Sequence, residues 1–541
     1  MPNRRIIIIC ICVLIFLISC SSSTRLEDHI YYRLNADIST LDPALITDVN
    51  GGYIAAKIFN GLVRLGEGLS VVPDLAERWE ISRDGLRYRF HIKKGIHFQN
   101  GLEVTARDFM YSFERVLARE TRSPNTWVFE NVVGADEFRR GKAAEVKGFR
   151  AVDDHLFEIL LRKPFSPFLN ILTTTSAYVV SERDIDRWKK DYSVHPSGTG
   201  PFTLREWMPN RQIVLERKEG YFEGAAKVRG IVYRIIPEDL TATAEFELGN
   251  LDVLSLPASV YSKFRKDIKW KRHIFSIKGL NTYYLGLNCS RPPFNNEKLR
   301  RAVAGAIDRK KILDTFFEGR GRLAAGPVPD LLRKWEMDSR LQDVTAYDPQ
   351  RAEKLIREAG LYGVTVNMFV TADQDVVDLA EIIQNYLSKV GIKVNIKQLE
   401  WSSFKQAINS GEPDMFWLSW WADYPDPENF LFPLFHSSNF GAGGNRTRYV
   451  NQEVDGLIEK GRGSLGERKR NDFYKRTEEL IIRDVPWVPF WHRTDYLVAQ
   501  SWIKGYKVYP IYSMDKGTEI RIERGNGKQL LINVSDIVTG I

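Results

Sequence analysis

Residues 79–115 read WEISRDGLRYRFHIKKGIHFQNGLEVTARDFMYSFER, and this segment combines a strand pattern with a turn signal. Apolar and polar side chains alternate from Tyr88 to Ile92, and a period of two is typical of a strand with one buried face. Asp84-Gly85 lies shortly before this run, and such a pair favours a tight turn between strands. The segment therefore predicts two strands joined by a turn.

Further strand patterns occur along the chain and are interspersed with helix patterns. A period of two recurs at 214–215, 364–368 and 392–396. Helices are expected at 349–360 and 379–387, because their apolar residues recur at helical spacing and glycines follow them. Strands and helices alternate without a regular βαβ rhythm, which predicts a mixed α/β fold in preference to a barrel or a sandwich.

The whole chain has the composition of a large globular protein. Its 541 residues are 43% hydrophobic and 12% aromatic, which is enough for a large core and suggests roughly two to four domains. Lys and Arg outnumber Asp and Glu by 77 to 69. This small excess is spread along the chain, whereas a nucleic-acid-binding protein concentrates its cations on one face. Neither disorder nor nucleic-acid binding is therefore expected.

The N-terminus carries an export signal. Arg4 and Arg5 precede an unbroken apolar run at 6–18, which is short for a membrane span and fits the core of a secretory signal peptide. The next residues, Leu17-Ile18-Ser19-Cys20, resemble the lipobox of bacterial lipoproteins, whose cysteine is lipidated and becomes the new first residue. We expect a signal peptide at 1–19, a tether at 20–27 and lipidation of Cys20. An uncleaved membrane anchor is the alternative, and both interpretations place the remaining chain outside the cytoplasm.

Cysteines contribute no disulfide framework to the mature chain. Cys10 and Cys12 lie inside the expected signal peptide, Cys20 is the expected lipidation site, and Cys289 remains alone. A disulfide within the mature chain is therefore not expected. The stability of the exported protein has to come from the size of its core.

No local motif indicates catalysis or a metal site. The eight histidines are nowhere three or four residues apart, and the patterns HExxH, CxxC and GxSxG are absent. Residues 441–444 lack the ending of a phosphate-binding loop and are interpreted as a surface loop. Asp423 with Asp426 or Glu428 could serve a glycosidase, but closeness in sequence does not set the carboxyl spacing that such an enzyme needs. We expect no enzymatic activity, no cofactor and no bound metal.

A series of short motifs extends along the chain. They are TLDPA at 40–44, the segment 79–115, GTGPF at 198–202, the segment 283–309, and WWADYPDPENF at 420–430. Together they resemble the periplasmic oligopeptide- and dipeptide-binding proteins of ABC transporters. The resemblance covers about residues 30–515.

The resemblance implies an α/β fold of the periplasmic-binding-protein type, with two ligand-enclosing lobes and a third, accessory domain. A discontinuous lobe I would comprise residues 28–55, 190–285 and 495–541. Residues 56–189 would form the accessory domain, and residues 286–494 would form lobe II.

Most of the motif residues are expected to maintain the fold. Gly198 and Gly200 are expected to adopt unusual backbone angles, which glycine tolerates. Leu299, Val303 and Ala306 have the spacing of one buried helix face.

The resemblance also implies a ligand-binding segment near the motif at 420–430. In peptide-binding relatives, the aspartate at the position of Asp423 pairs with the α-ammonium group of the peptide. The alternative is a structural role, in which Asp423 caps a turn before Pro425. The aromatic residues expected to line the site are Trp417, Trp420, Trp421 and Tyr424.

Two questions about this segment stay open at the level of sequence. Three tryptophans in five residues are equally compatible with a hydrophobic core. Some oligopeptide binders carry a basic residue at the position of Trp417, where it meets the ligand carboxylate. Because this chain has a tryptophan there, the residue that recognises a ligand carboxylate is not assigned.

The implied function is that of an extracytoplasmic, lipid-anchored receptor that binds peptides between two lobes and delivers them to an ABC importer. Its expected partners are a peptide ligand, the permease subunits and the membrane that holds its lipid, and we expect a monomer. One alternative is a receptor of the same fold for a metal chelate, an oligosaccharide or an opine-like compound. A glycosidase is the remote alternative.

Overall fold

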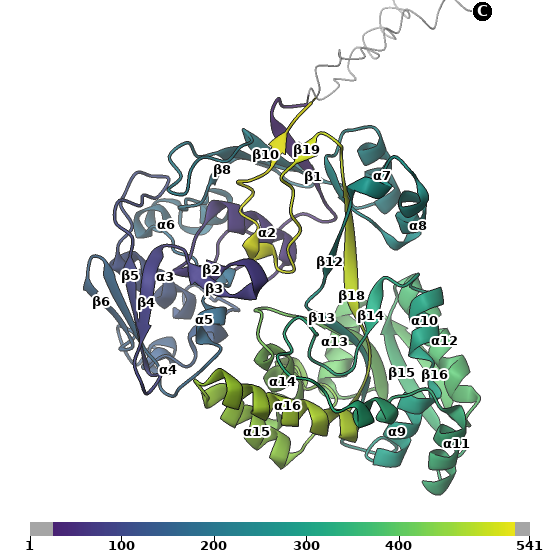
Figure 1. Cartoon of the computed structure of the whole chain (residues 1–541). Helices are drawn as coiled ribbons and strands as arrows, with labels where there is room; N and C mark the ends of the chain where they lie inside the picture. Colours follow the sequence, from purple (N-terminus) through teal and green to yellow (C-terminus); the bar gives the residue numbers. More distant parts are fainter. Residues whose placement is uncertain (1–24, 525–541) are drawn as a thin grey trace, which may run out of the picture.

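Three parts make up the protein, as the computed structural model in Figure 1 shows. The structure describes residues 25–524. The expected signal peptide, Cys20 and most of the tether lie outside the described residues. We call the three parts lobe I, lobe II and the accessory domain, and their mixture of sheets and helices confirms the predicted α/β fold with two lobes.

A single twelve-stranded sheet extends through both lobes of the described chain, in the order β16-β15-β17-β13-β18-β11-β1-β10-β9-β8, with β12 and β14 also paired to β18. Its lobe I strands are β1 (His29–Leu34), β8 (Phe202–Met208), β9 (Gln212–Arg217), β10 (Gly230–Ile235), β11 (Val253–Ser255) and β12 (Ile274–Lys278). Its lobe II strands are β13 (Asn281–Leu287), β14 (Gly321–Leu323), β15 (Thr365–Thr371), β16 (Lys393–Leu399) and β17 (Met415–Trp421). The long strand β18 (Trp487–Ala499) belongs to both lobes.

Helices cover both faces of this sheet. In lobe I they are α2 (Val49–Ile58), α7 (Asp239–Glu247) and α8 (Ala258–Lys266). In lobe II, one face packs against α9 (Glu297–Ala306), α10 (Arg309–Thr315), α11 (Pro349–Glu358) and α12 (Gln374–Ser388). The opposite face packs against α13 (Trp401–Ser410), α14 (Glu428–Phe435), α15 (Gln452–Gly463) and α16 (Glu467–Asp484). Each lobe therefore has two apolar layers, and successive residues of a strand enter different layers.

The accessory domain has its own antiparallel sheet, in the order β4-β5-β7-β6. The strands are β4 (Ala76–Ile81), β5 (Arg87–Ile92), β6 (Phe149–Asp153) and β7 (Leu156–Leu160). The helices of this part are α3 (Ala106–Leu117), α4 (Ala135–Arg139), α5 (Phe168–Ile171) and α6 (Glu182–Trp188), beside a small pair β2 (Val63–Leu65) and β3 (Val71–Pro73). A phenylalanine-rich core joins α3 to the sheet.

The chain crosses between the lobes at two neighbouring points. β12 pairs with the second half of β18, and β13 pairs with the first half. Gly279 and Leu280 connect β12 to β13. We propose that the lobe boundaries lie at this connection and in the middle of β18, near Thr494.

The local predictions from sequence agree with the structure. β4 and β5 form the antiparallel pair expected around Asp84-Gly85, and Gly85 has a φ of 70°. The expected strands at 214–215, 364–368 and 392–396 lie in β9, β15 and β16, and the expected helices are α11 and α12. The predicted stripe of α9 is buried, with Leu299 and Val303 at 0% and Ala306 at 1% exposure.

The prediction for Gly198 and Gly200 is wrong in its mechanism. Neither residue is among those with a positive φ. Instead, a Cβ at either position would collide with the backbone carbonyls at the end of α2, those of Lys57 and Ile58. Gly200 also donates its N–H to the Ile58 oxygen at 2.7 Å. Glycine is required here because two segments of backbone touch, which sequence alone does not reveal.

We expect Gly200→Ala to destabilise the protein by about 1–3 kcal/mol, because the added methyl group would force α2 away from the GTGPF segment. The matched control is Gly220→Ala, where a Cβ would meet no atom within 4 Å. Urea unfolding followed by tryptophan fluorescence should give a lower midpoint for Gly200→Ala only. Equal midpoints for the two variants would contradict the packing argument.

Candidate functional site

Two adjoining cavities lie beside the strand that crosses between the lobes; the larger has walls from both lobes, and the smaller is lined by lobe I and by Arg493. Their volumes are about 440 Å³ and about 800 Å³, and Asp239, Pro257 and Arg493 line both. We call them together the interlobe cleft. Volumes in this range suit small-molecule and short-peptide ligands. Because both lobes contribute to its walls, movement of one lobe against the other would open or close it.

An aromatic wall forms the lobe II side of this cleft. β13 and β17 are antiparallel, with Tyr283 opposite Ser419, so residues 417, 419 and 421 share the face of Tyr283. The ring of Tyr283 lies 6.2 Å from Trp417, 6.2 Å from Trp491 and 6.5 Å from Trp421, measured between centroids. Tyr283, Trp417 and Trp491 line the larger cavity, although Trp417 and Trp491 are only 6% and 2% exposed, and Trp421 lies outside that lining.

The three expected tryptophans differ in their surroundings. Trp417 lines the cleft but is only 6% exposed, and it packs into the core against α9 to α12. Trp421 is 44% exposed. Trp420 lies on the opposite face of β17, where it packs against the α13 to α16 layer and donates its Nε1–H to Asn429 at 3.3 Å. The structure therefore brings Trp417 and Trp421 to one face and leaves Trp420 on the other.

Asp423 lies in the turn between β17 and α14. The Asn429 side chain at the start of α14 accepts a hydrogen bond from the Asp423 backbone at 3.0 Å and donates one to its carboxylate at 3.2 Å. Asp423 is exposed to solvent, although protein surrounds its carboxylate on most sides. This partial desolvation raises the pKa of Asp423, and the bond from Asn429 opposes the shift.

No basic side chain among residues 25–524 lies within 4.0 Å of the Asp423 carboxylate. Its charge reaches Tyr512 of the C-terminal segment of lobe I. Burial is the main cause that raises the pKa of this phenol, a hydrogen bond with Thr175 lowers it, and the negative charge of Asp423 raises it further. An ionised carboxylate that faces the other lobe without a cation is suited to receive a positively charged group from a ligand.

Tyr424 lies in the contact between lobe II and the accessory domain. Its ring stacks against Trp127 at 5.9 Å between centroids, within the core of the accessory domain. Its hydroxyl donates to Glu428. Next to it, Asn170 of α5 donates to Asp426 at 3.0 Å. The structure thus places Tyr424, which the resemblance implied as a ligand contact, between two domains.

The carboxylates considered for a glycosidase are engaged in packing. Asp426 and Glu428 are each 1% exposed. Asp426 pairs with Arg470, and Glu428 pairs with Arg462 at 2.9 Å. A sugar ring has no access to groups that are buried in this way, so the arrangement does not support glycoside hydrolysis.

Sequence reasoning missed Tyr283, Trp491 and Arg493 as lining residues of the cleft. Strict period two along β18 would not find them, because the pairing of β13 with β18 is irregular between Tyr283 and Tyr284. Trp487 consequently packs in the α13 to α16 layer, whereas Trp491 packs in the α9 to α12 layer. What the sequence did not show is that this strand lies beside β13 and passes between the lobes.

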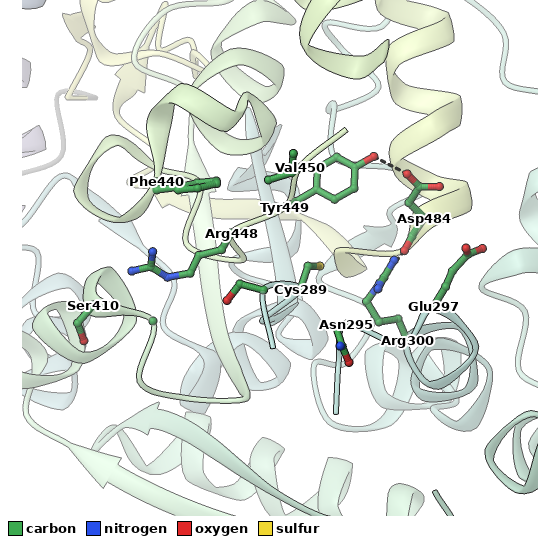
Figure 2. A pocket seen from close by; sticks show the side chains of 12 residues that line it. Cys289, Asn295, Glu297, Arg300, Ser410, Phe440, Arg448, Tyr449, Val450 and Asp484 are labelled. Atoms are coloured by element: carbon green, nitrogen blue, oxygen red, sulfur yellow. Dashed lines mark hydrogen bonds between the residues drawn. The ribbon is translucent and has the colours of Figure 1, made fainter. Parts of the chain in front are cut away.

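A separate cavity of about 730 Å³ lies wholly within lobe II, at the end of β13 (Figure 2). Its polar groups already bind one another: Tyr449 donates its hydroxyl to Asp484 at 2.5 Å, and Arg300 donates Nε–H to the Asp484 backbone oxygen at 2.8 Å. Burial raises the pKa of Cys289 in this cavity to about 11, which keeps the thiol protonated. All residues that line this cavity belong to lobe II, whereas the larger cavity of the interlobe cleft has walls from both lobes.

Two features of the described residues bear on the class of site. Between residues 25 and 524, no group of three or more His, Cys, Asp or Glu side chains is arranged to hold a metal ion. Over the same residues, no helix combines the length and the apolar character needed to cross a bilayer.

Comparisons with known proteins identify relatives over almost the whole chain. The profile described as "Bacterial extracellular solute-binding proteins, family 5 Middle" matches residues 70–442. Heme-binding protein A of Haemophilus influenzae is 31% identical over 512 residues, which are 91% of this chain and 91% of that protein. The dipeptide-binding protein of Escherichia coli is 27% identical over 478 residues, which are 84% of this chain and 88% of that protein.

The same likeness is found in three dimensions. The periplasmic binding protein DppA from Helicobacter pylori, solved in complex with the peptide STSA, superimposes with a TM-score of 0.76 and 26% sequence identity. The superposition covers 92% of this chain and 98% of that one.

The two tryptophans of the cleft face should respond differently to truncation. We expect Trp417→Ala to lower the free energy of unfolding by about 3–5 kcal/mol, because its ring is buried in the lobe II core. Trp421→Ala should change the stability much less, because that ring is 44% exposed. Urea unfolding of the two variants is the measurement. Equal losses of stability would mean that Trp421 is a core residue too.

Proposed function

Because the chain belongs to family 5 of the bacterial extracellular solute-binding proteins, we propose that it binds peptides in the interlobe cleft and delivers them to the permease of an ABC importer. The proposal rests mainly on Asp423, whose carboxylate has no basic partner within 4.0 Å among residues 25–524. Asp423 lies in the turn after β17, near Tyr512 of lobe I and outside the lining of the two cavities. A receptor of this kind performs no chemistry on its ligand. The protein acts outside the cytoplasm, as the family does.

We propose that Asp423 pairs with the α-ammonium group of the peptide. Once the lobes close, the ammonium group leaves water, and burial without a counter-charge would be costly. Asn429 holds the carboxylate in place from the rigid start of α14. The carboxylate is therefore oriented before the ligand arrives, and little side-chain entropy has to be lost on binding.

The backbone of β17 can hold the extended part of a peptide. β15 pairs with β17 only at Met415 and Phe416, while β13 accompanies β17 to Trp421. Among the named strands, residues 418–421 thus have a neighbour on one side only. An extended peptide can form strand-like hydrogen bonds with such an edge whatever its side chains are, which suits a receptor of broad specificity.

Haem is the second candidate ligand, because one of the relatives is named as a heme-binding protein. The residues that line the two cavities of the cleft include no His, Cys or Met, and tyrosine is the only type of haem-iron ligand among them. This composition favours peptides. No feature of the cleft favours an oligosaccharide or an opine-like compound.

We expect Asp423→Asn to weaken binding of free peptides by roughly 3–5 kcal/mol, or about two to three and a half decades in affinity. N-acetylation of the peptide should cause a comparable loss with the wild-type protein. The two losses should not add, because they break the same pair. Isothermal titration of both proteins with both peptides measures the coupling. Only the ionised Asp423 carboxylate can pair with the ammonium group, and burial raises the pKa of this carboxyl. Wild-type affinity should therefore fall as the pH decreases through the pKa of Asp423, because the carboxylate becomes protonated.

The control for this cycle is Asp495→Asn, which removes another carboxylate near the cleft, one already paired with Arg493 at 2.7 Å. It should retain the preference for a free amino terminus. If Asp423→Asn binds free peptides within threefold of the wild type, the ammonium group is bound elsewhere and haem becomes the leading candidate.

We further propose that a lipid on Cys20 anchors a monomeric receptor to the membrane, because residues 17–20 resemble a lipobox. Cys20→Ala should abolish incorporation of labelled palmitate and release the exported protein from membranes. Cys289→Ala is the matched control and should leave the label unchanged, because its thiol is buried in lobe II. Undiminished labelling of Cys20→Ala would refute the anchor.

A further inference from the structure

Two arginines line the interlobe cleft where the chain crosses between the lobes. Arg320 precedes β14, and Arg493 lies on β18. Both line the cavity of about 800 Å³. β14 and β18 are paired at Gly321 and Arg493, and Thr494 donates its N–H to the Arg320 oxygen at 3.3 Å. Their backbones are thus fixed relative to each other by the sheet.

The arginines of the cleft differ in their partners. Arg33 pairs with Asp239 at 2.7 Å, and Arg493 pairs through Nε with Asp495 at 2.7 Å. The Arg493 side chain nevertheless keeps 43% of its surface exposed. Arg320 donates Nε–H to the Phe317 backbone oxygen at 3.1 Å, and among residues 25–524 no carboxylate oxygen lies within 4.0 Å of it. Its terminal nitrogens are therefore available to a ligand.

The guanidinium groups of Arg320 and Arg493 can attract an anion at this place. Burial lowers the pKa of Arg320, and the like charge of Arg493 lowers it further, although Glu318 and Asp375 act in the opposite sense. The group remains protonated at neutral pH. An anion between the two guanidinium groups would relieve their repulsion and replace the water that Arg320 loses on lobe closure.

Acidic residues line the same cavity and limit what it can accept. Glu318, Asp373, Asp375 and Asp378 lie on its lobe II side. They would repel a ligand with a large negative charge, whereas a single carboxylate can reach the arginines. A planar guanidinium group offers such a carboxylate two parallel hydrogen bonds.

We propose that Arg320, with Arg493 beside it, binds a carboxylate group of the ligand. The inference rests on the proposed function in that it places a ligand in the interlobe cleft. It assigns a residue to the recognition of the ligand carboxylate. Some oligopeptide binders use a basic residue at the position of Trp417 for this purpose, but this chain has a tryptophan there. A peptide supplies this group as its C-terminus, and haem supplies it as a propionate, so the chemistry is shared by the two candidate ligands.

The test compares Arg320→Gln with the wild type on two pairs of probes. The first pair is tri-L-alanine and its C-terminal amide, and the second is haemin and its dimethyl ester. Wild-type protein should bind the free acid of a recognised pair about tenfold or more tightly than the neutral derivative. Arg320→Gln should bind both members equally, at the affinity of the neutral derivative. Arg320→Lys keeps the positive charge but loses the planar guanidinium group with its two parallel donors. It should restore part of the preference for the free acid.

The matched control is Arg322→Gln, on the same strand β14. Arg322 pairs with Asp330 at 2.7 Å and is not among the residues that line the cleft. It should leave the preference for the free acid unchanged. Thermal unfolding of each variant establishes that the affinities are compared between folded proteins.

The outcomes separate this inference from the proposed function. If tri-L-alanine binds and Arg320→Gln keeps the wild-type preference for the free acid, the inference is overturned while the peptide receptor stands. If only haemin binds and Arg320→Gln loses the preference for the free acid over the ester, the inference stands and the peptide receptor falls. Binding of neither pair by the wild type overturns both.

Discussion

The hydrogen bonding of β18 to strands of both lobes is the constraint on which the arrangement of the protein depends. Its first half pairs with β13 and β14, and its second half with β11 and β12. The lobes therefore share one sheet, and the spacing of groups across the cleft is set where that sheet passes from one to the other. Relative motion has to occur by bending or twisting at this place, because the flanking strands are held in register.

Two largely buried arginines of lobe II pair with carboxylates, whereas two charged groups at or near the cleft do not. Arg333 pairs with Glu478 at 2.9 Å, and Arg462 pairs with Glu428 at the same distance, both within well-packed regions. Asp423 and Arg320, by contrast, have no ionic partner among the described residues. An unpaired ion that loses water on closure destabilises the closed form without ligand. A ligand with charges of both signs removes this penalty, so it can shift the population toward closure.

The sequence predicted the elements better than it predicted the site. Strands and helices such as β5, β15 and α11 follow from local period and capping, which act within a few residues. The role of Gly198 and Gly200 depends on α2, which lies far away in the chain. For the tryptophans, period two predicts that 417 and 421 share a face while 420 does not. Which of them is buried depends on the helices packed on each face, and Arg320 shows no local pattern at all.

Asp423, the proposed ligand anchor, is followed directly by Tyr424, which packs in the core of the accessory domain. Tyr424 stacks on Trp127, and Asp426 is bonded to Asn170, so the turn that presents the anchor is fixed to a domain that lines neither cavity of the cleft. Any change in the packing of Trp127 would tilt this turn and alter how firmly the ligand is held. The accessory domain can thus set the residence time of the cargo, and with it the rate of unloading at the permease, while the contacts that define ligand selectivity stay the same.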